Sequence, residues 1–296
     1  MSRKKPISTK RSLFSRLKIS AQYRMYVVNR FITRLNTWLL NKTAEHIYYK
    51  NLSEKELIAS RKSDTVFIFG SSYSLNTLSK KEWHFFETHD TVGFNWFVHQ
   101  NWIRCDFQLI RGISNFDMDK QIWKSDLEQY FTLINSKSLY SNTIFLVQKG
   151  FAAINGNRTI GLKLLPKTSK IFRWKKTRGP DPKFSFDQGL SHNNSSLDET
   201  VNFAFLMGWK HIVLVGVDLY DRRYFWLPSD EARLIDTVRN FTVNDPARDG
   251  KVESIGKWKT IFEQHGINLY VYNPKSLLAD VLPIYEHQQQ KINTIE

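Results

Sequence analysis

Short, almost entirely apolar segments that end at a glycine or a polar residue place the strongest constraint on how this chain can fold. The longest is His211–Tyr220 (HIVLVGVDLY), and a second, Thr65–Phe69 (TVFIF), ends at Gly70. An apolar run without polar alternation is typical of a parallel strand that is covered on both faces. Segments with helical periodicity lie between these runs. The sequence therefore predicts an α/β fold with a Rossmann-like, mostly parallel sheet flanked by helices.

The other expected elements follow the same alternation. The remaining expected strands are Thr91–Asn95, Cys105–Ile110, Thr143–Gln148 and Asn268–Tyr272, and the expected helices are Asp117–Ile134, Leu197–Met207, Glu253–His265 and Ser276–Ile284. Residues 175–194 are polar and contain Gly and Pro, and we expect this segment and residues 221–250 to form active-site loops or a lid. The single cysteine, Cys105, excludes an intramolecular disulfide framework and a cysteine-based zinc site.

Positive charge is concentrated at the N-terminus. The chain has 296 residues and a formal net charge of +15, and twelve of its 43 Lys and Arg lie in residues 1–50 beside one acidic residue, Glu45. The rest of the chain is close to neutral, which argues against a nucleic-acid-binding surface over the whole protein. We therefore divide the chain into a basic arm, residues 1–61, and a Rossmann-like domain, residues 62–296.

The basic arm has the pattern of an amphipathic helix. Its apolar residues are three or four positions apart and fall within an arc of roughly 80°; they are Phe14, Leu17, Ala21, Met25, Val28, Ile32, Leu35 and Leu39. Trp38, Tyr48 and Tyr49 are aromatic residues of the kind found at membrane interfaces. No apolar run reaches the roughly 20 residues that span a bilayer, and no secretory signal is evident.

Three partners fit such an arm. Residues 10–42 can lie on an anionic cytoplasmic leaflet, where each basic residue contributes about 1 kcal/mol. Alternatively, the apolar stripe packs on the protein's own body, or the arm binds nucleic acid. We favour the membrane surface and expect no nucleic acid; a homo-oligomer remains open.

The candidate site lies where the strands end, because open α/β sheets bind ligands beyond the carboxyl ends of their strands. The first strand is followed by Gly70, Ser71 and Ser72, a turn whose hydroxyls and N–H groups can hold phosphate or ribose. The second expected strand ends in Asn95, whose amide can read a base or a sugar edge.

The apolar run that begins at His211 supplies the second part of this candidate site. It leads to Asp218 and Tyr220, and Tyr224 follows four residues later. Phenols at these positions can donate hydrogen bonds to a phosphate that gains charge as it leaves. The alternative is that Tyr220 and Tyr224 form a half-buried aromatic rim.

A second enzymatic interpretation rests on Asp117-Met118-Asp119. Two carboxylates at this spacing can bind Mg²⁺ or Mn²⁺ and hold the diphosphate of a UDP-sugar. An Asp N-cap with a second Asp in the first helical turn explains the same pattern. A third interpretation is a non-enzymatic membrane-surface adaptor with a Rossmann-like scaffold.

Three motifs resemble the bacterial sialyltransferases of glycosyltransferase family 42. They are VFIFGSSYSLN, MGWKHIVLVGVDLYDRRYF and INLYVYNPKSLLAD, and the similarity extends from about Asp64 to Ile284. The resemblance implies a GT-A-like variant of the Rossmann fold. It also implies a metal-independent, inverting transfer of sialic acid from CMP-sialic acid to cell-surface glycans, with no cofactor.

The resemblance also assigns roles to residues. Asn95 and Ser196 match nucleotide-binding residues, Asp218 matches the aspartate at the strand end, and Tyr220 and Tyr224 match tyrosines that stabilise the leaving phosphate. We add Gly70, Ser71, Ser72 and Asp218 as nucleotide-binding residues, although Ser71 replaces the family's asparagine.

Two departures from the family concern the catalytic base and the donor. The family's histidine before the penultimate helix is absent, so another residue has to take the proton from the attacking hydroxyl. We choose Asp249 for this role, with Asp245 and His192 as the other candidates. The changed opening turn leaves CMP-Kdo as a competitor to CMP-sialic acid. We expect an acceptor in lipopolysaccharide or capsule biosynthesis, with the enzyme peripheral on the inner face of a bacterial inner membrane.

Overall fold

The computed structural model describes residues 13–111, 114–117, 122–193, 195–220, 223–227 and 250–286. Its helices are α1 Leu13–Tyr48, α2 Glu54–Ile58, α3 Lys80–Glu87, α4 Leu127–Ser136, α5 Ile154–Gly161, α6 Ser196–Met207 and α8 Lys251–Glu263. Its strands are β1 Lys50–Asn51, β2 Thr65–Phe69, β3 Asp90–Phe94, β4 Phe107–Ile110, β5 Ser114–Asp117, β6 Ile122–Ser125, β7 Ile144–Lys149, β8 Lys170–Arg178, β9 Leu190–His192, β10 His211–Val215 and β11 Asn268–Val271.

The main sheet has nine strands in the order β1-β8-β7-β4-β3-β2-β10-β11, with β9 paired to β8. All of these neighbours are parallel. The strand order reverses at β2, because the chain continues to β3 and β4 on one side and returns later to β10 and β11 on the other. This is the expected Rossmann-like α/β architecture.

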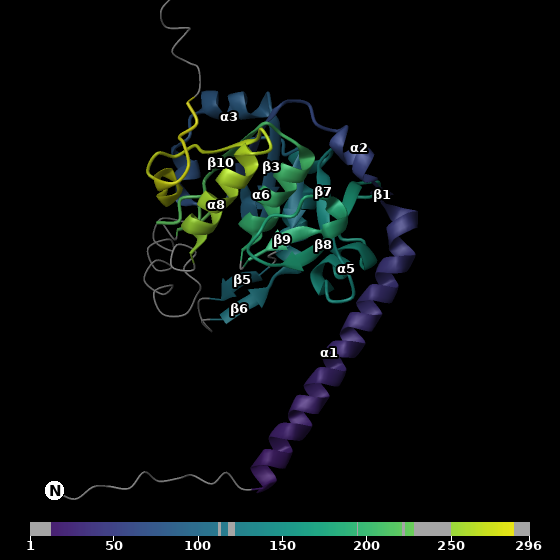
Figure 1. The fold of residues 1–296 in the computed structure, drawn as a ribbon. Helices are drawn as coiled ribbons and strands as arrows, with labels where there is room; N and C mark the ends of the chain where they lie inside the picture. Colours follow the sequence, from purple (N-terminus) through teal and green to yellow (C-terminus); the bar gives the residue numbers. More distant parts are fainter. Residues whose placement is uncertain are drawn as a thin grey trace, which may run out of the picture.

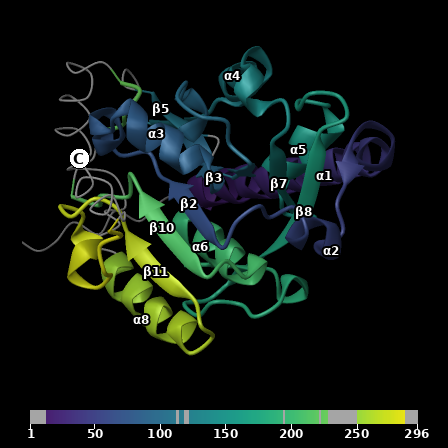
Figure 2. The same cartoon turned by 90° about the horizontal axis from the view of Figure 1, so that it is seen from above.

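Helices cover both faces of the sheet, which explains the uninterrupted apolar strands. In β2, Val66 and Ile68 point to the core beneath α6 and α8, whereas Phe67 and Phe69 point to the core beneath α3 and α4. All five residues of β2 are buried. Figure 2 shows α6 and α8 on one side of the sheet and α3 and α4 on the other. Side chains on both faces therefore have to be apolar.

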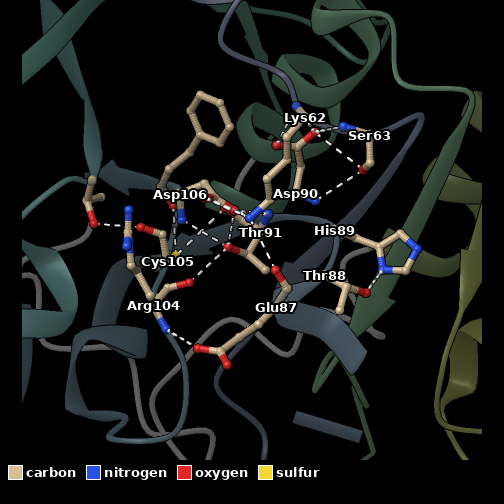
Figure 3. A network of polar contacts seen from close by, with 12 residues as sticks. Lys62, Ser63, Glu87, Thr88, His89, Asp90, Thr91, Arg104, Cys105 and Asp106 are labelled. Atoms are coloured by element: carbon tan, nitrogen blue, oxygen red, sulfur yellow. Dashed lines mark hydrogen bonds and ion pairs between the residues drawn. The ribbon is translucent and has the colours of Figure 1, made fainter. Parts of the chain in front are cut away.

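Polar side chains fix the register at the amino ends of the central strands (Figure 3). The buried Asp90 carboxylate accepts hydrogen bonds from the N–H groups of Lys62 and Ser63 and from the Trp209 indole. Asp106 accepts from the Thr91 N–H and hydroxyl. Both carboxylates are thus paired, and these contacts tie β2, β3, β4 and the start of β10 together at the edge opposite the strand ends.

Residues 117–134 do not form the single helix that the sequence predicts. β5 and β6 form an antiparallel hairpin that pairs Ser114 with Ser125, and α4 begins only at Leu127. The N-cap of α4 is Asp126, whose carboxylate accepts the Gln129 N–H at 3.0 Å. The explanation of Asp117 as an N-cap is therefore wrong, and Asp119 lies outside the described residues.

Three other expected bounds need correction. The strand expected over 211–220 ends at Val215, because the chain turns at Gly216 with a positive φ. Part of the loop expected over 175–194 is strand: β8 continues to Arg178 and β9 covers Leu190–His192. The helix expected over 276–284 is a short 3₁₀ turn, Leu277–Asp280. The expected loop over 221–250 lies mostly outside the described residues.

The N-terminal helix α1 is one continuous helix of 36 residues, about 54 Å long. Its C-terminal part packs against α5, with Thr37, Asn41 and Ala44 buried, and the rest extends beyond the body (Figure 1). Tyr49, expected at a membrane interface, is instead buried in the core. Within the described residues, no helix combines the length and apolarity that crossing a bilayer requires.

Candidate functional site

Parallel pairing gathers the polar residues that follow the strands along one edge of the sheet. The edge runs from Arg111 after β4, through Asn95 after β3 and Ser71 and Ser72 after β2, to Asp218 after β10. The strand order reverses between β2 and β10. That switch point is where open α/β sheets bind their ligands.

At the switch point, the turn after β2 contacts the turn after β10 directly. The Ser72 N–H donates to the Gly216 carbonyl at 3.0 Å, and the Asp218 N–H donates to the Ser72 hydroxyl at 3.1 Å. Ser72 also forms an isolated bridge with Tyr224. The structure thus brings Ser72, Asp218 and Tyr224 together, although the first two are 146 residues apart in sequence.

Gly70 allows this close approach. A Cβ at this position would lie 2.3 Å from the Gly216 carbonyl oxygen, which is closer than real Cβ atoms come to any neighbour. The Gly70 N–H donates to the Val215 carbonyl at 2.8 Å. Packing of the two turns therefore explains the glycine at this position.

Asp218 is fully buried at the end of the β10 turn. One of its carboxylate oxygens, Oδ1, accepts from the Asn273 amide at 2.8 Å, and its backbone carbonyl accepts from the Leu277 N–H. Ser276 donates to the neighbouring Val217 carbonyl at 2.7 Å. These contacts attach the β10 turn to the segment after β11, which makes Asp218 a support of the site's backbone.

The two tyrosines differ in their surroundings. Tyr224 is half-buried, and its ring stacks on Trp226 with centroids 4.5 Å apart and planes 15° apart. Tyr220 is 46% exposed and follows Leu219, which has a φ of +65°. Both lie beyond the carboxyl end of β10, where the sequence places them.

Asn95 adopts the left-handed conformation, with a φ of +50°, directly after β3. Its carbonyl accepts from the Gln108 side chain of β4 at 3.2 Å, and the same Gln108 amide lies 3.1 Å from the Tyr130 hydroxyl. Few residues other than glycine adopt this conformation, and those that do are often found at functional sites.

A second cluster, formed by Arg111, His192 and Glu199, lies at the carboxyl ends of β4 and β9. Arg111 follows β4, His192 ends β9, and Glu199 lies in the first turn of α6. The Glu199 Oε1 is ion-paired with the Arg111 guanidinium and lies 3.1 Å from the His192 Nδ1. Glu199 is fully buried, and its Oε2 makes no hydrogen bond to any described residue.

Burial and neighbouring cations keep the His192 ring neutral. Burial, together with the charges of Arg111 and Lys176, lowers the pKa of His192 to about 4. Burial also lowers the pKa of Arg111 to about 10, which leaves the guanidinium charged at neutral pH. The site therefore presents a neutral imidazole beside a positive charge, which suits taking up a proton next to a bound anion.

A buried ion pair supports the loop that follows His192. The Lys251 Nζ, at the start of α8, lies 2.8 Å and 2.9 Å from the two Asp198 carboxylate oxygens and 2.5 Å from the Asn193 carbonyl. Asp198 also accepts the N–H groups of Asn193 and Ser195. The chain on both sides of residue 194 is thus attached to α6 and α8.

Sequence reasoning missed Arg111, Glu199 and Lys251. Arg111 directly follows the apolar residues of β4, so the strand-end argument that selected Asn95 could have found it. Glu199 and Lys251 belong to helices, and only the fold shows that they face the same edge. Ser196 begins α6 as expected, next to the N-cap Ser195. Asp249 and Asp245 lie outside the described residues.

Among the described residues, no group of three His, Cys, Asp or Glu side chains is placed to hold a metal ion. Of the rival UDP-sugar site, the backbone of Asp117 lies in β5 and Asp119 falls in an undescribed gap.

The solved structures that resemble this chain include sialyltransferases. One is the sialyltransferase Cst-II in complex with CMP, a tyrosine-to-phenylalanine variant that is 15% identical; the match covers 75% of this chain and 86% of Cst-II with a TM-score of 0.44. Another is the monofunctional alpha-2,3-sialyltransferase Cst-I from Campylobacter jejuni, which is 14% identical, with coverage of 79% and 88% and a TM-score of 0.44. No family model and no curated protein matches the chain.

Proposed function

We propose that this protein is an inverting, metal-independent glycosyltransferase that moves an acidic sugar, sialic acid or Kdo, from a CMP donor to a saccharide acceptor. The observation that carries the proposal is the arrangement along one sheet edge. Ser72, Asp218 and Tyr224 meet at the switch point, and Asn95 lies between them and the Arg111–His192–Glu199 cluster. A scaffold protein would have no need for these groups on one edge.

The chemistry divides between the two ends of this edge. The turn of Ser71 and Ser72, together with Asn95 and Ser196, holds the nucleotide, and Tyr220 and Tyr224 donate to the phosphate of CMP. The acceptor hydroxyl forms a bond to the anomeric carbon on the face opposite the leaving group. The bond from that carbon to the phosphate oxygen breaks, and its electron pair remains on CMP.

The proton of the attacking hydroxyl goes to His192 in this proposal. A ring nitrogen of the neutral imidazole can accept it. Arg111 supplies positive charge for the carboxylate of the acidic sugar. We choose His192 over Asp249 as the base because the carboxylate of Glu199 lies 3.1 Å from its Nδ1.

A thermal-shift titration tests the nucleotide class. We expect CMP to raise the melting temperature by a few degrees, with no effect of EDTA, because a ligand that binds only the native state stabilises it by about 2.7 kcal/mol at a hundredfold excess over Kd. UDP, GDP and NAD, each with EDTA or Mn²⁺, are the comparison ligands. Ser71→Ala should reduce the CMP shift, and Ser74→Ala in the 3₁₀ helix that follows this turn should not.

The other outcomes of this titration are equally decisive. A shift with UDP that requires Mn²⁺ would contradict the CMP donor and favour Asp117 and Asp119. The absence of any nucleotide shift would favour the adaptor.

We also propose that α1 holds the enzyme on an anionic membrane surface. The side chains of Val28, Ile32, Leu35 and Leu39 are between 36% and 54% exposed. At about 100° per residue they lie roughly opposite Thr37 and Asn41, which face the body. The exposed stripe therefore does not pack on the described part of the chain, and twelve Lys and Arg in residues 1–50 give it charge complementarity to anionic lipid.

The position of α1 also suits this role. Phe31 contacts Phe151, which lies just beyond the carboxyl end of β7, with ring centroids 5.7 Å apart. The helix before residue 31 thus continues past the edge that carries the candidate site, on the side of the β5–β6 hairpin (Figure 1). Binding of α1 to lipid would keep this edge close to an acceptor embedded in the same leaflet.

Sedimentation of the full chain with lipid vesicles tests the membrane proposal. We expect binding to vesicles of phosphatidylcholine with phosphatidylglycerol, weakened by high salt, and little binding to phosphatidylcholine alone. Changing Ile32, Leu35 and Leu39 together to Ser should lower the affinity by about tenfold or more, because the buried apolar area is lost. The matched control is Asn29→Ser with Asn36→Ser on the same helix.

Two results would contradict this assignment. Equal binding by the stripe variant and its control would exclude the stripe as the lipid contact. A mass that rises with protein concentration in the absence of vesicles, and only with the stripe intact, would assign the stripe to a second copy of the chain.

A further inference from the structure

The buried carboxylate of Glu199 has a relation to His192 that the proposed transfer does not require. It comes from α6, whereas His192 ends β9, and the two are held by different elements. Its Oε1 lies 3.1 Å from the His192 Nδ1. An ionised carboxylate can only accept hydrogen bonds, so the hydrogen in this contact belongs to Nδ1. The neutral ring is then the Nδ1–H tautomer, with its lone pair on Nε2.

Arg111 contacts the same ring from above its face, so the in-plane lone pair of Nε2 stays accessible. Its Nη1 is 3.0 Å from the His192 Nδ1, and its Nη2 is 3.3 Å from Nε2. The in-plane directions of the two ring nitrogens diverge, so one guanidinium cannot bond both in the plane. The two distances instead fit a guanidinium lying over the face of the ring, a contact that arginine makes readily.

Of the charged groups that face His192 from the neighbouring elements, the cations oppose its protonation and the Glu199 carboxylate favours it. Arg111 of the β4 end, Lys176 of β8 and Lys251 of α8 are cations that lower the pKa of His192. Asp198 is paired with Lys251. Glu199 is the carboxylate in direct contact with the ring. A proton on His192 is therefore favoured by Glu199, by a backbone hydrogen bond with Ser195 and by any anion that binds beside Arg111.

We infer that Glu199 is a positioning residue that fixes His192 as the Nδ1–H tautomer and stabilises the imidazolium formed when Nε2 takes the proton of the acceptor hydroxyl. This inference rests on the proposed transfer for its catalytic part. Its structural part, the tautomer, is a property of the free protein. A donor with a carboxylate or phosphate beside Arg111 would offset the guanidinium charge, so the ring becomes more basic once the donor is bound.

Nitrogen NMR of the ¹⁵N-histidine-labelled full chain tests the tautomer without any substrate. We expect His192, assigned by comparison with His192→Gln, to be neutral and protonated on Nδ1 near pH 7. Addition of CMP should raise its apparent pKa. A ring protonated on Nε2, or an imidazolium in the free protein at pH 7, would overturn the inference. This readout stands even if the chain transfers no sugar, so it separates the inference from the proposed function.

Kinetics of Glu199→Gln test the catalytic part. We expect kcat to fall by about tenfold to a hundredfold with the donor KM nearly unchanged, because the stabilised cation forms only in the transition state. The acid limb of the kcat profile should move to higher pH with Glu199→Asp than with Glu199→Gln, since Asp keeps the charge. Adding Glu199→Gln to His192→Gln should cause no further loss, because the carboxylate then has no ring to act on.

The control is the same Glu-to-Gln substitution at a half-exposed position. Glu263→Gln removes a half-exposed carboxylate that pairs with Lys259 at 3.0 Å on α8, and it should leave kcat unchanged. A Glu199→Gln enzyme with the turnover of this control would overturn the catalytic part. If Glu199→Gln fails to fold, the wild-type tautomer and the Glu199→Asp profile still decide.

Discussion

The double variant Tyr220→Phe with Tyr224→Phe should turn over about a thousandfold more slowly than the wild type, with a much smaller change in the donor KM. A single hydrogen-bond donor aimed at developing charge contributes about 10²–10³ to kcat in enzymes that use one. The phosphate of CMP gains negative charge as the glycosidic bond breaks. The two phenols therefore stabilise the transition state more than the ground state, and their loss appears in kcat.

The structure indicates that this substitution leaves the fold intact. The Tyr224 ring is held by stacking on Trp226, with centroids 4.5 Å apart, and by the backbone bridge to Ser72. Phenylalanine preserves both contacts and removes only the hydroxyl. Tyr220 is 46% exposed, so its substitution disturbs no core packing.

Steady-state kinetics with CMP-sialic acid and CMP-Kdo would measure the effect. Tyr73→Phe is the matched control: this half-buried tyrosine lies in the same neighbourhood, with Arg223 4.1 Å above its ring, and has no role in the proposed transfer. Turnover in the double variant equal to that of Tyr73→Phe would remove the tyrosine pair from the mechanism and favour an aromatic rim.

The strands of the core could be predicted from the sequence because burial on both faces leaves a local signal. β2 matches its expected bounds, and β10 begins at the expected residue. The end of α6 is also predictable, since Gly208 adopts the left-handed conformation that caps a helix. Such features depend on the residues of one segment and their periodicity.

The β5–β6 hairpin could not be predicted in the same way. Its strands stabilise each other by pairing, as between Asp117 and Ile122, and the connecting residues carry no Gly, Pro or Asn turn signal. The helical period over 117–134 comes partly from α4 and extends by chance into β6. Pairing between segments overrides such a weak local pattern.

The sequence predicts which strand ends carry the candidate site, but it does not predict which of their side chains contact each other. The sequence selects Ser72 and Asp218, and the sheet order shows that they touch across 146 positions. It selects His192 as a loop residue, whereas the structure places it at the end of β9, between Arg111 and Glu199. Those partners come from a different strand and from a helix, so no spacing in the sequence relates them to His192.

Lys251→Met should lower the free energy of unfolding by about 3–5 kcal/mol, the usual cost of leaving a buried charge without its partner. Lys251 is 2% exposed, and its Nζ lies 2.8 Å from the Asp198 Oδ1. Without the ammonium, the fully buried Asp198 carboxylate keeps the N–H groups of Asn193 and Ser195 and the more distant Ser195 hydroxyl, none of which carries a charge. Urea denaturation followed by circular dichroism would measure the loss.

Lys259→Met on the same helix is the matched control. Lys259 also forms an ion pair, at 3.0 Å to Glu263, but in partial contact with solvent, and such pairs contribute at most about 1 kcal/mol. Adding Asp198→Asn to Lys251→Met should recover much of the lost stability, because the amide oxygen still accepts the backbone N–H groups and carries no charge. Equal losses in Lys251→Met and Lys259→Met would mean that the Asp198–Lys251 pair does not hold the chain around residue 194 against α6 and α8. If it does, the same substitution should also loosen His192, since Lys251 and Asp198 both bond to the adjacent Asn193.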